Sequence, residues 1–236
     1  MYGYTATHHP RGIGTAAVGS VLAGSFPAPD PFIIHQYTND FDTFDSATGG
    51  DWTVTGTGTN ALVAGDGGLL ASVNSAALND VTCISLKVAT FALVAGNEAW
   101  MKVRFKVSSA ANTAAIIGLT NLTTNPFGTA PTDGLYFSTV ASQPTLTLKS
   151  ANTSVTTTAT PVATLADNTF LNVGFHYDGV STVAYYVNNN RIGSFAPNLT
   201  TANLALTFAE QNGTAAAVTT TIDYVTVATQ RPSTAL

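Results

Sequence analysis

The chain has 236 residues, of which 45% are hydrophobic and only 9% charged, and its net charge is −5. This length fits one all-β domain or two small domains. The charged fraction is far below the usual ~25%, so Thr, Asn, Ser and Gly must form most of the polar surface. Such a composition is typical of secreted β modules and virion proteins. A weakly acidic chain gains little free energy from contact with nucleic-acid phosphates, so we expect no binding to nucleic acid. No apolar run is long enough to cross a membrane, so we expect no membrane partner either.

Residues 1–38 differ in composition from the rest of the chain. They are rich in Gly and Ala and end in SFPAPDPF, where proline occupies every second position. Alternating prolines keep the backbone extended and remove hydrogen-bond donors, so we expect an arm that does not join the sandwich as regular strands. Such an arm binds by covering a large surface, and we expect it to contact a neighbouring subunit or another protein through Tyr2, Tyr4, Arg11, Phe26, Pro29 and Phe32.

From residue 39 onward, short runs rich in β-branched and aromatic residues alternate with turn signals. This spacing predicts an antiparallel sandwich or barrel over residues 39–236. No long stretch has helical periodicity, and no internal repeat is evident. The expected strands are 51–55, 68–73, 81–89, 99–108, 114–120, 134–140, 145–149, 155–160, 170–177, 182–188, 191–195, 204–210 and 218–228.

The first half of this domain contains a cluster of aspartates and the single cysteine of the chain. Asp40, Asp42 and Asp45 cluster in NDFDTFD, where we expect them to cap turns or line a strand edge. Cys83 is the single cysteine, so no internal disulfide forms, and its place on an expected strand predicts a buried, inert thiol. A chain without disulfides is consistent with assembly in a reducing cytoplasm.

The segment WMKVRFKV predicts a strand with two different faces. Lys102, Arg104 and Lys106 alternate with apolar residues, so the period of a strand places the three cations together. We expect either a solvated outer face or a docking stripe for an acidic partner. Trp100 shares this face, and Trp100 and Tyr186 are our candidates for stacking on a sugar ring.

Residues 170–195, FLNVGFHYDGVSTVAYYVNNNRIGSF, hold the most informative pattern in the chain. They predict a strand, a tight turn at Asp178-Gly179, a second strand, an Asn-rich turn and a third strand. Asn188 and Asn189 suit the second turn because asparagine tolerates left-handed backbone conformations. Residues 221–228, TIDYVTVA, predict a partner strand near the C-terminus.

These hairpins resemble the YDG and VNG hairpins of laminin-G and concanavalin-like domains. TIDYVTVA resembles their closing strand, which is found also in family-sixteen glycoside hydrolases. The longer frame of FDTFDSATGGDWTV, AGDGGLLASVN, MKVRFKVSSA, TDGLYFS, ATLADNTF and AEQNGTAA resembles a group of tailed-bacteriophage virion proteins, over roughly residues 40–230. The resemblance implies a concanavalin-like antiparallel jelly-roll sandwich behind an extended N-terminal arm, and a structural or capsid-associated role.

The motifs of enzymes that share this fold are missing from the sequence. Glycoside hydrolysis needs two carboxylates beside the scissile bond, which the family-sixteen hydrolases place as E-x-D-x-x-E on one strand. The chain has only Glu98 and Glu210, far apart, and it has no G-x-S-x-G elbow and no Cys/His cluster. His176 is expected to be a surface residue. The sequence therefore predicts a protein that is not an enzyme, with no catalytic residues and no cofactor.

Calcium is the metal that such sandwiches most often hold. Asp66, Asp178 and Asp223 are candidate oxygen donors, but no D-x-D-x-D-G loop is present. We expect Asp66 and Asp178 to form turns instead, and we predict no metal site.

The sequence thus favours a non-enzymatic virion structural protein, a capsid decoration or cement protein. We expect it to bind the head shell through its N-terminal arm and sandwich base, with the major capsid protein and further copies of itself, as a trimer, for partners. Its expected location is the capsid surface of the virion, after assembly in the host cytoplasm. The alternative is a glycan-binding, lectin-like module of a phage head or tail fibre that contacts a host surface glycan.

Overall fold

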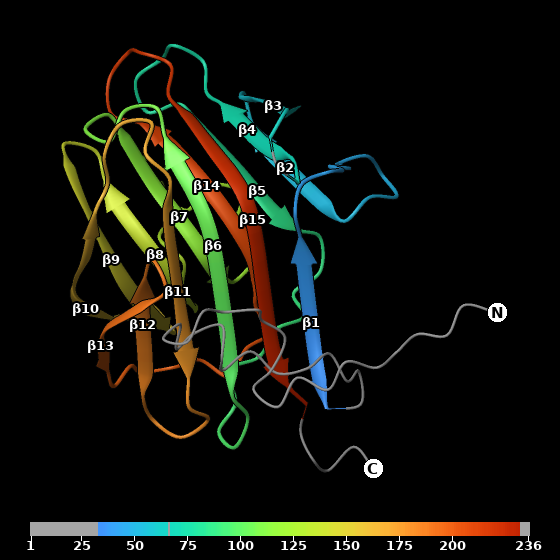
Figure 1. Ribbon diagram of the computed structural model, residues 1–236, viewed down its shortest axis with the longest axis vertical. Helices are drawn as coiled ribbons and strands as arrows, with labels where there is room; N and C mark the ends of the chain where they lie inside the picture. The colour runs from blue at the N-terminus through green and yellow to red at the C-terminus, as the bar shows by residue number, and fades with distance from the viewer. Residues whose placement is uncertain (1–32, 66, 232–236) are drawn as a thin grey trace.

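Two antiparallel sheets stack face to face in the computed structural model, which describes residues 33–65 and 67–231 (Figure 1). Every strand pair is antiparallel, and the described residues contain no helix. Accordingly, no described helix is suited in length and hydropathy to crossing a membrane. The predicted all-β sandwich is confirmed.

We call the eight-stranded sheet sheet A and the seven-stranded sheet sheet B. Sheet A runs in the order β13-β12-β11-β6-β15-β4-β3, with β1 also pairing β15, and sheet B in the order β10-β9-β8-β7-β14-β5-β2. The strands are β1 (Ile34–Asn39), β2 (Trp52–Gly56), β3 (Thr59–Val63), β4 (Leu69–Val73), β5 (Val81–Leu86), β6 (Ala99–Val107), β7 (Thr113–Thr120), β8 (Gly134–Val140), β9 (Gln143–Asn152), β10 (Val155–Thr164), β11 (Leu171–Tyr177), β12 (Val183–Val187), β13 (Asn190–Phe195), β14 (Ala205–Asn212) and β15 (Thr219–Gln230).

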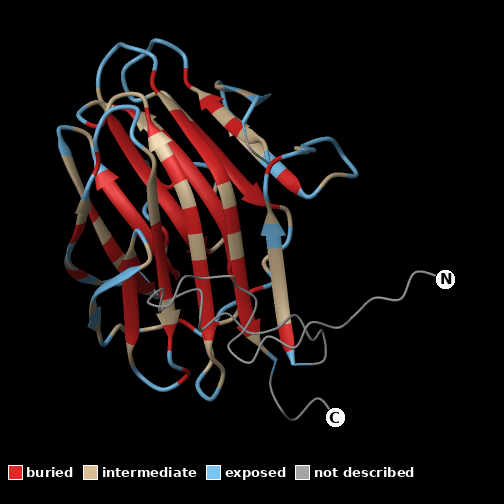
Figure 2. Ribbon diagram, in the orientation of Figure 1, coloured by how far each residue is buried: buried red, intermediate tan, exposed pale blue. Residues whose placement is uncertain are grey.

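The interior is a single apolar cluster between the two sheets. Buried residues alternate with partly exposed ones along the central strands of sheet A (Figure 2). The cluster includes Phe105 and Phe175 of sheet A and Phe137 and Phe208 of sheet B. Trp52 is fully buried, with its ring centroid 5.7 Å from that of Phe208. Burial of each such side chain contributes about 1.5–3 kcal/mol, so this shared core holds the sheets together.

The C-terminal strand β15 is the centre of sheet A. One side pairs with β6 over most of its length, and the other side pairs with β4 at its start and β1 at its end. This is the closing strand that the TIDYVTVA pattern predicts. The Asn-rich turn also forms as expected, because Asn188 and Asn189 have φ of 48° and 67°.

Strand β1 corrects the predicted boundary of the arm. Residues that we expected to stay outside the sandwich pair with β15, from Ile34 opposite Gln230 to Asn39 opposite Val225. The alternation in IHQYTN explains this: His35 packs against Phe91 with the rings tilted and their centroids 4.9 Å apart, and Tyr37 packs edge-on against Trp52. The sandwich therefore begins at β1. The arm contacts predicted at Tyr2, Tyr4, Arg11, Phe26, Pro29 and Phe32 lie outside the described residues.

Candidate functional site

The outer face of sheet A gathers the polar and aromatic side chains that the sequence singled out. Along β6, Met101, Val103 and Phe105 point into the core and are fully buried. The intervening Trp100, Lys102, Arg104 and Lys106 therefore share the opposite face, because successive side chains of a strand alternate. We call these three cations the cation row; its predicted role as a docking stripe stays a prediction.

The cations of this row are engaged with groups of the same face. The Arg104 guanidinium donates to the Asp223 carboxylate in an ion pair, and it lies 4.1 Å from the centroid of the Phe170 ring. Lys106 lies 4.8 Å from the same centroid, and Lys102 lies 5.5 Å from that of Tyr224. Burial lowers the pKa of Lys102. The row is thus a compensated surface of cations and rings and not an open patch of positive charge.

A bulge in β15 creates the ion pair. Ile222 lies opposite Phe105 and Tyr224 lies opposite Arg104, so Asp223 is the extra residue. A bulge re-aims side chains: Ile222 joins the core, while Asp223 and Tyr224 reach Arg104 and Asn172 on the outer face. Burial raises the pKa of the Tyr224 hydroxyl to about 12, which keeps it a hydrogen-bond donor to Asn172. No sequence signal marks this bulge.

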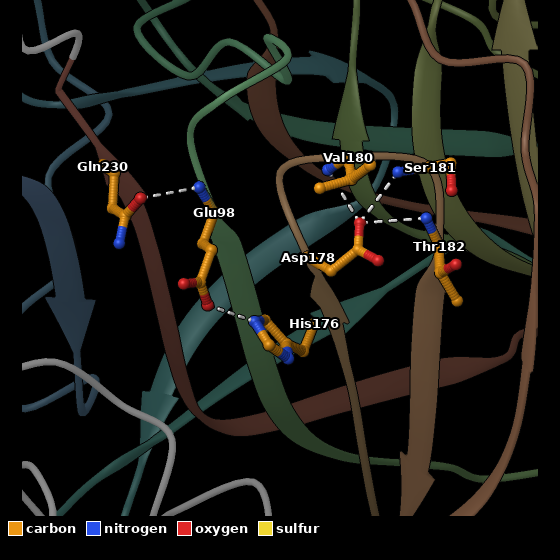
Figure 3. Close-up of polar contacts among 7 residues, drawn as sticks. All are labelled: Glu98, His176, Asp178, Val180, Ser181, Thr182 and Gln230. Carbon is orange, nitrogen blue, oxygen red and sulfur yellow. Dashed lines mark hydrogen bonds and ion pairs between the residues drawn. The ribbon is translucent and has the colours of Figure 1, made fainter.

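At one end of the face, a carboxylate and an imidazole form a pair (Figure 3). Glu98 Oε2 lies 2.7 Å from His176 Nε2, and the Glu98 backbone N–H donates to Gln230 Oε1 at 2.9 Å. The His176 ring stacks on Trp100, with centroids 5.2 Å apart and an angle of 6° between planes. The side chains of His176 and Glu98 are 20% and 39% exposed, so both are partly accessible from the surface.

Sequence reasoning missed this cluster, which we call the Glu98–His176 cluster. The two residues are 78 positions apart: His176 lies on β11, and Glu98 immediately precedes β6. They meet because β11 pairs β6 in the register that sets His176 opposite Trp100. The hydrophobic alternation of both strands contained part of the signal, since it put His176 and Trp100 on polar faces, but register does not follow from one strand alone.

The two rings proposed for sugar stacking belong to a small apolar cluster on the same face. It consists of Ile34, Trp100, Ala184, Tyr186 and Ala228. Trp100 and Tyr186 are each only 3% exposed. Stacking on a sugar requires an open ring face, and neither ring offers one in this structure.

The carboxylates weighed as calcium ligands are used within the fold. Asp178 Oδ1 accepts the backbone N–H groups of Val180, Ser181 and Thr182 at 2.8, 2.9 and 3.0 Å, which closes the β11–β12 turn (Figure 3). Burial opposes ionisation of Asp178, but these donors lower its pKa below the ordinary value. Asp223 is paired with Arg104, and Asp66 lies outside the described residues. In the described part of the chain, no three His, Cys, Asp or Glu side chains cluster as metal ligands would.

The outer face of sheet B is built mostly from small, uncharged residues, with a few larger side chains and with Lys149 of β9 as a cation. Cys83, Ile116, Tyr136, Ala151 and Ala209 form a buried cluster on it, against which Phe127 packs. Burial raises the pKa of the Cys83 thiol to about 11, so it is protonated, as expected of an inert cysteine. Among the described strands of sheet B, the sole acidic residue is Glu210 of β14.

Two surface hollows adjoin β1 and share His35 and Thr90. One, of about 310 Å³, is also lined by Tyr37, Asp51 and Lys87. The other, of about 440 Å³, is also lined by Asn203, Gln230 and Arg231. Burial and the nearby Arg231 charge lower the pKa of His35. The second hollow also borders β15, through Thr229 and Gln230.

Comparisons with known proteins show the fold. No family model matches the chain, and no curated protein matches it. A Shewanella oneidensis MR-1 protein of unknown function is 16% identical over 84% of this chain and 87% of its own, with a TM-score of 0.60. Bacillus licheniformis β-glucanase is 11% identical over 81% and 97%, with a TM-score of 0.59. The conserved carbohydrate esterase of the Shiga toxin-encoding bacteriophage phi24B is 17% identical over 78% and 94%, with a TM-score of 0.52.

These neighbours confirm a concanavalin-like jelly roll. They also correct one prediction. The conclusion that the protein is not an enzyme was wrong, because proteins of this architecture include a glucanase and a phage carbohydrate esterase. A missing E-x-D-x-x-E motif excludes one arrangement of catalytic groups, whereas the fold carries several chemistries.

Proposed function

We propose that this chain is a structural protein of a tailed-phage particle, a decoration protein that binds the head shell. The observation that carries the proposal is the outer face of sheet A. It spans β1, β15, β6, β11 and β12, and its partly exposed side chains include Arg104, the two lysines of the cation row and Tyr224, whereas Trp100 and Tyr186 are buried. Arginine and tyrosine are enriched among the residues that dominate the energetics of protein–protein interfaces.

The chemistry of this face suits contact with a protein surface. Its arginine is held by Asp223 and Phe170, so the charge that reaches a partner is already oriented and partly compensated. An interface of this kind gains specificity from electrostatic match and avoids the cost of an unpaired buried cation. We propose that the major capsid protein supplies the opposing surface and that copies of this chain assemble as trimers on it.

The sequence resemblance to phage virion proteins and the composition of residues 1–38 support the same proposal. Residues 1–32 lie outside the described part of the chain, and their role as a shell-binding arm rests on sequence alone. The occurrence of the same fold in a phage protein adds to this support.

A particle-binding assay tests the proposal. Purified full-length protein is mixed with particles of its own phage that lack it, and bound protein is measured after sedimentation. We expect the K102A/K106A variant to lose at least about tenfold in affinity, because each cation contributes on the order of 1 kcal/mol at a wet interface. Lys149→Ala, on sheet B, is the matched control and should bind like wild type. Binding by K102A/K106A equal to that of the control would contradict a role for this face.

A second candidate function, recognition or turnover of a glycan, is favoured by the Glu98–His176 cluster. It joins a partly exposed carboxylate and imidazole beside a tryptophan. Incubation with a glycan array, followed by assay of products, distinguishes this candidate. Binding or turnover that disappears in both Glu98→Gln and His176→Ala would favour it over the structural role, and no signal with any glycan would count against it.

A further inference from the structure

Four buried polar side chains face one another between the two sheets. In sheet B, Glu210 of β14 lies opposite Thr82 of β5. In sheet A, Thr220 of β15 lies opposite Ser72 of β4. All four line one small cavity in the sandwich, and each is at most 4% exposed. Two cross-strand pairs, one from each sheet, thus form a polar site inside an otherwise apolar interior.

The remaining walls of the cavity are apolar. They are provided by Ile84, Ile117, Phe208, Ala209 and Ile222. Burial raises the pKa of the Glu210 carboxyl to about 8, while the nearby hydroxyls of Thr220 and Ser72 lower it in part. Asp80 is the charged group that acts on it, and its negative charge raises the pKa further. The carboxyl is therefore a neutral acid at pH 7, with one donor and two acceptor sites.

The hydrogen-bonding capacity of this site is not met by the protein groups described. No hydrogen bond of regular geometry reaches Glu210 Oε1 or Oε2, Ser72 Oγ or Thr220 Oγ1 from another described residue. The hydroxyls stand beside the carboxyl without closing a good bond to it. Thr82 Oγ1, in contrast, accepts the backbone N–H of Gly58 at 3.1 Å. Polar groups left unpaired in the interior are unfavourable, so a partner for each of them would stabilise the fold.

We propose that this cavity is a binding site for one water molecule, which joins Glu210 of sheet B to Ser72 and Thr220 of sheet A. The cavity volume of about 10 Å³ corresponds to the space for the centre of a single water. A buried water makes about three hydrogen bonds to polar groups that otherwise lack partners, and the acid and the two hydroxyls supply them. A metal cation fits poorly, because it needs an ionised carboxylate and more oxygen ligands than this site offers. The inference is independent of the proposed function.

The first test is a crystal structure of the full chain at a resolution that shows ordered water. We expect one density peak within about 2.6–3.2 Å of the Glu210 carboxyl and of the Ser72 and Thr220 hydroxyls. A dry cavity, with the three side chains bonded directly to one another, would overturn the proposal. This measurement uses the wild-type protein and does not depend on a variant that folds.

The second test counts long-lived internal waters in solution by oxygen-17 magnetic relaxation dispersion. We expect the S72A/T220V variant to lose the signal of one water relative to wild type. Thr120→Val is the control, because it removes a buried hydroxyl that pairs with Thr207 and does not line this cavity. An equal number of long-lived waters in wild type and S72A/T220V would also overturn the proposal.

Discussion

At the scale of single residues, position between the sheets alters the chemistry of Glu210. In FAEQNG it follows Phe208 by two residues, which puts it on the face of β14 that points into the core. In the fold this residue is 2% exposed, and burial favours the protonated form. The side chain that sequence analysis set aside as an isolated glutamate is thus a buried acid whose ionisation is coupled to folding.

This coupling predicts how stability depends on pH. The folded pKa of about 8 exceeds the ordinary value of 4.5, so between these values the native state holds a proton that the unfolded chain releases. The stability contributed by Glu210 is fully present below pH 4.5 and is lost as pH rises through 8, with a slope of at most about 1.4 kcal/mol per pH unit. Urea unfolding from pH 5 to 9 should show this fall in wild type and a flatter profile in Glu210→Gln. Parallel profiles would contradict the prediction.

The Arg104–Asp223 pair gives a second prediction at this scale. Asp223 is 5% exposed and Arg104 is its cationic partner, so Arg104→Met leaves a buried carboxylate without compensation. We expect a loss of about 2–3 kcal/mol in the free energy of unfolding, less than for a fully buried pair because the arginine side chain is 37% exposed. Lys106→Met, on the same strand face, should change stability by less than about 0.5 kcal/mol. Similar losses for both variants, measured by denaturant unfolding, would show that the pair is unimportant.

At the scale of elements, β1 shows how a short strand depends on the neighbouring strand and on the core side chains that it contacts. The prolines and glycines that precede β1 in the sequence predict an extended arm, but β1 itself alternates apolar and polar residues. Its inward residues complete the core beside Trp52 and Phe91, and its backbone fills the part of β15 that β4 leaves unpaired. Pairing with β15 therefore fixes where the sandwich begins.

Two truncated proteins test this boundary. A chain that starts at Ile33 keeps β1, whereas a chain that starts at Asp40 lacks it and exposes the rings that β1 covers. We expect the shorter protein to be less stable than the longer one by about 3–5 kcal/mol, given the burial of Ile34 and Tyr37 and the lost strand pairing. Equal midpoints in urea would restore residue 39 as the boundary.

At the scale of the whole molecule, the two sheets are joined into one structural unit. The two sheets share one core cluster, and strands distant in sequence, such as β1 and β15 or β4 and β15, are paired. Such non-local topologies fold slowly, in milliseconds to seconds, because loop closure must precede the favourable contacts. The length of the sequence is compatible with one or two domains, and the shared core shows that the described residues form one domain.

Cooperativity is the prediction that belongs to this scale. We expect a single urea transition for the full chain, with the same midpoint by far-ultraviolet circular dichroism and by fluorescence of its two tryptophans, Trp52 in the core and Trp100 on the outer face. Separate midpoints for the two probes would indicate that the sheets, or parts of them, unfold independently.

The sequence by itself determined the all-β class, most strand positions, the turns at Asp178 and the asparagines, and the grouping of the cation row with Trp100. These features depend on alternation and turn chemistry, which act over a few residues. Only the tertiary structure decided that β1 joins the sandwich, that a bulge brings Asp223 to Arg104, that Glu98 meets His176, and that Glu210 meets Ser72 and Thr220 of the opposite sheet. Each of these depends on which strands pair and in what register, and register is set by contacts among residues far apart in the chain.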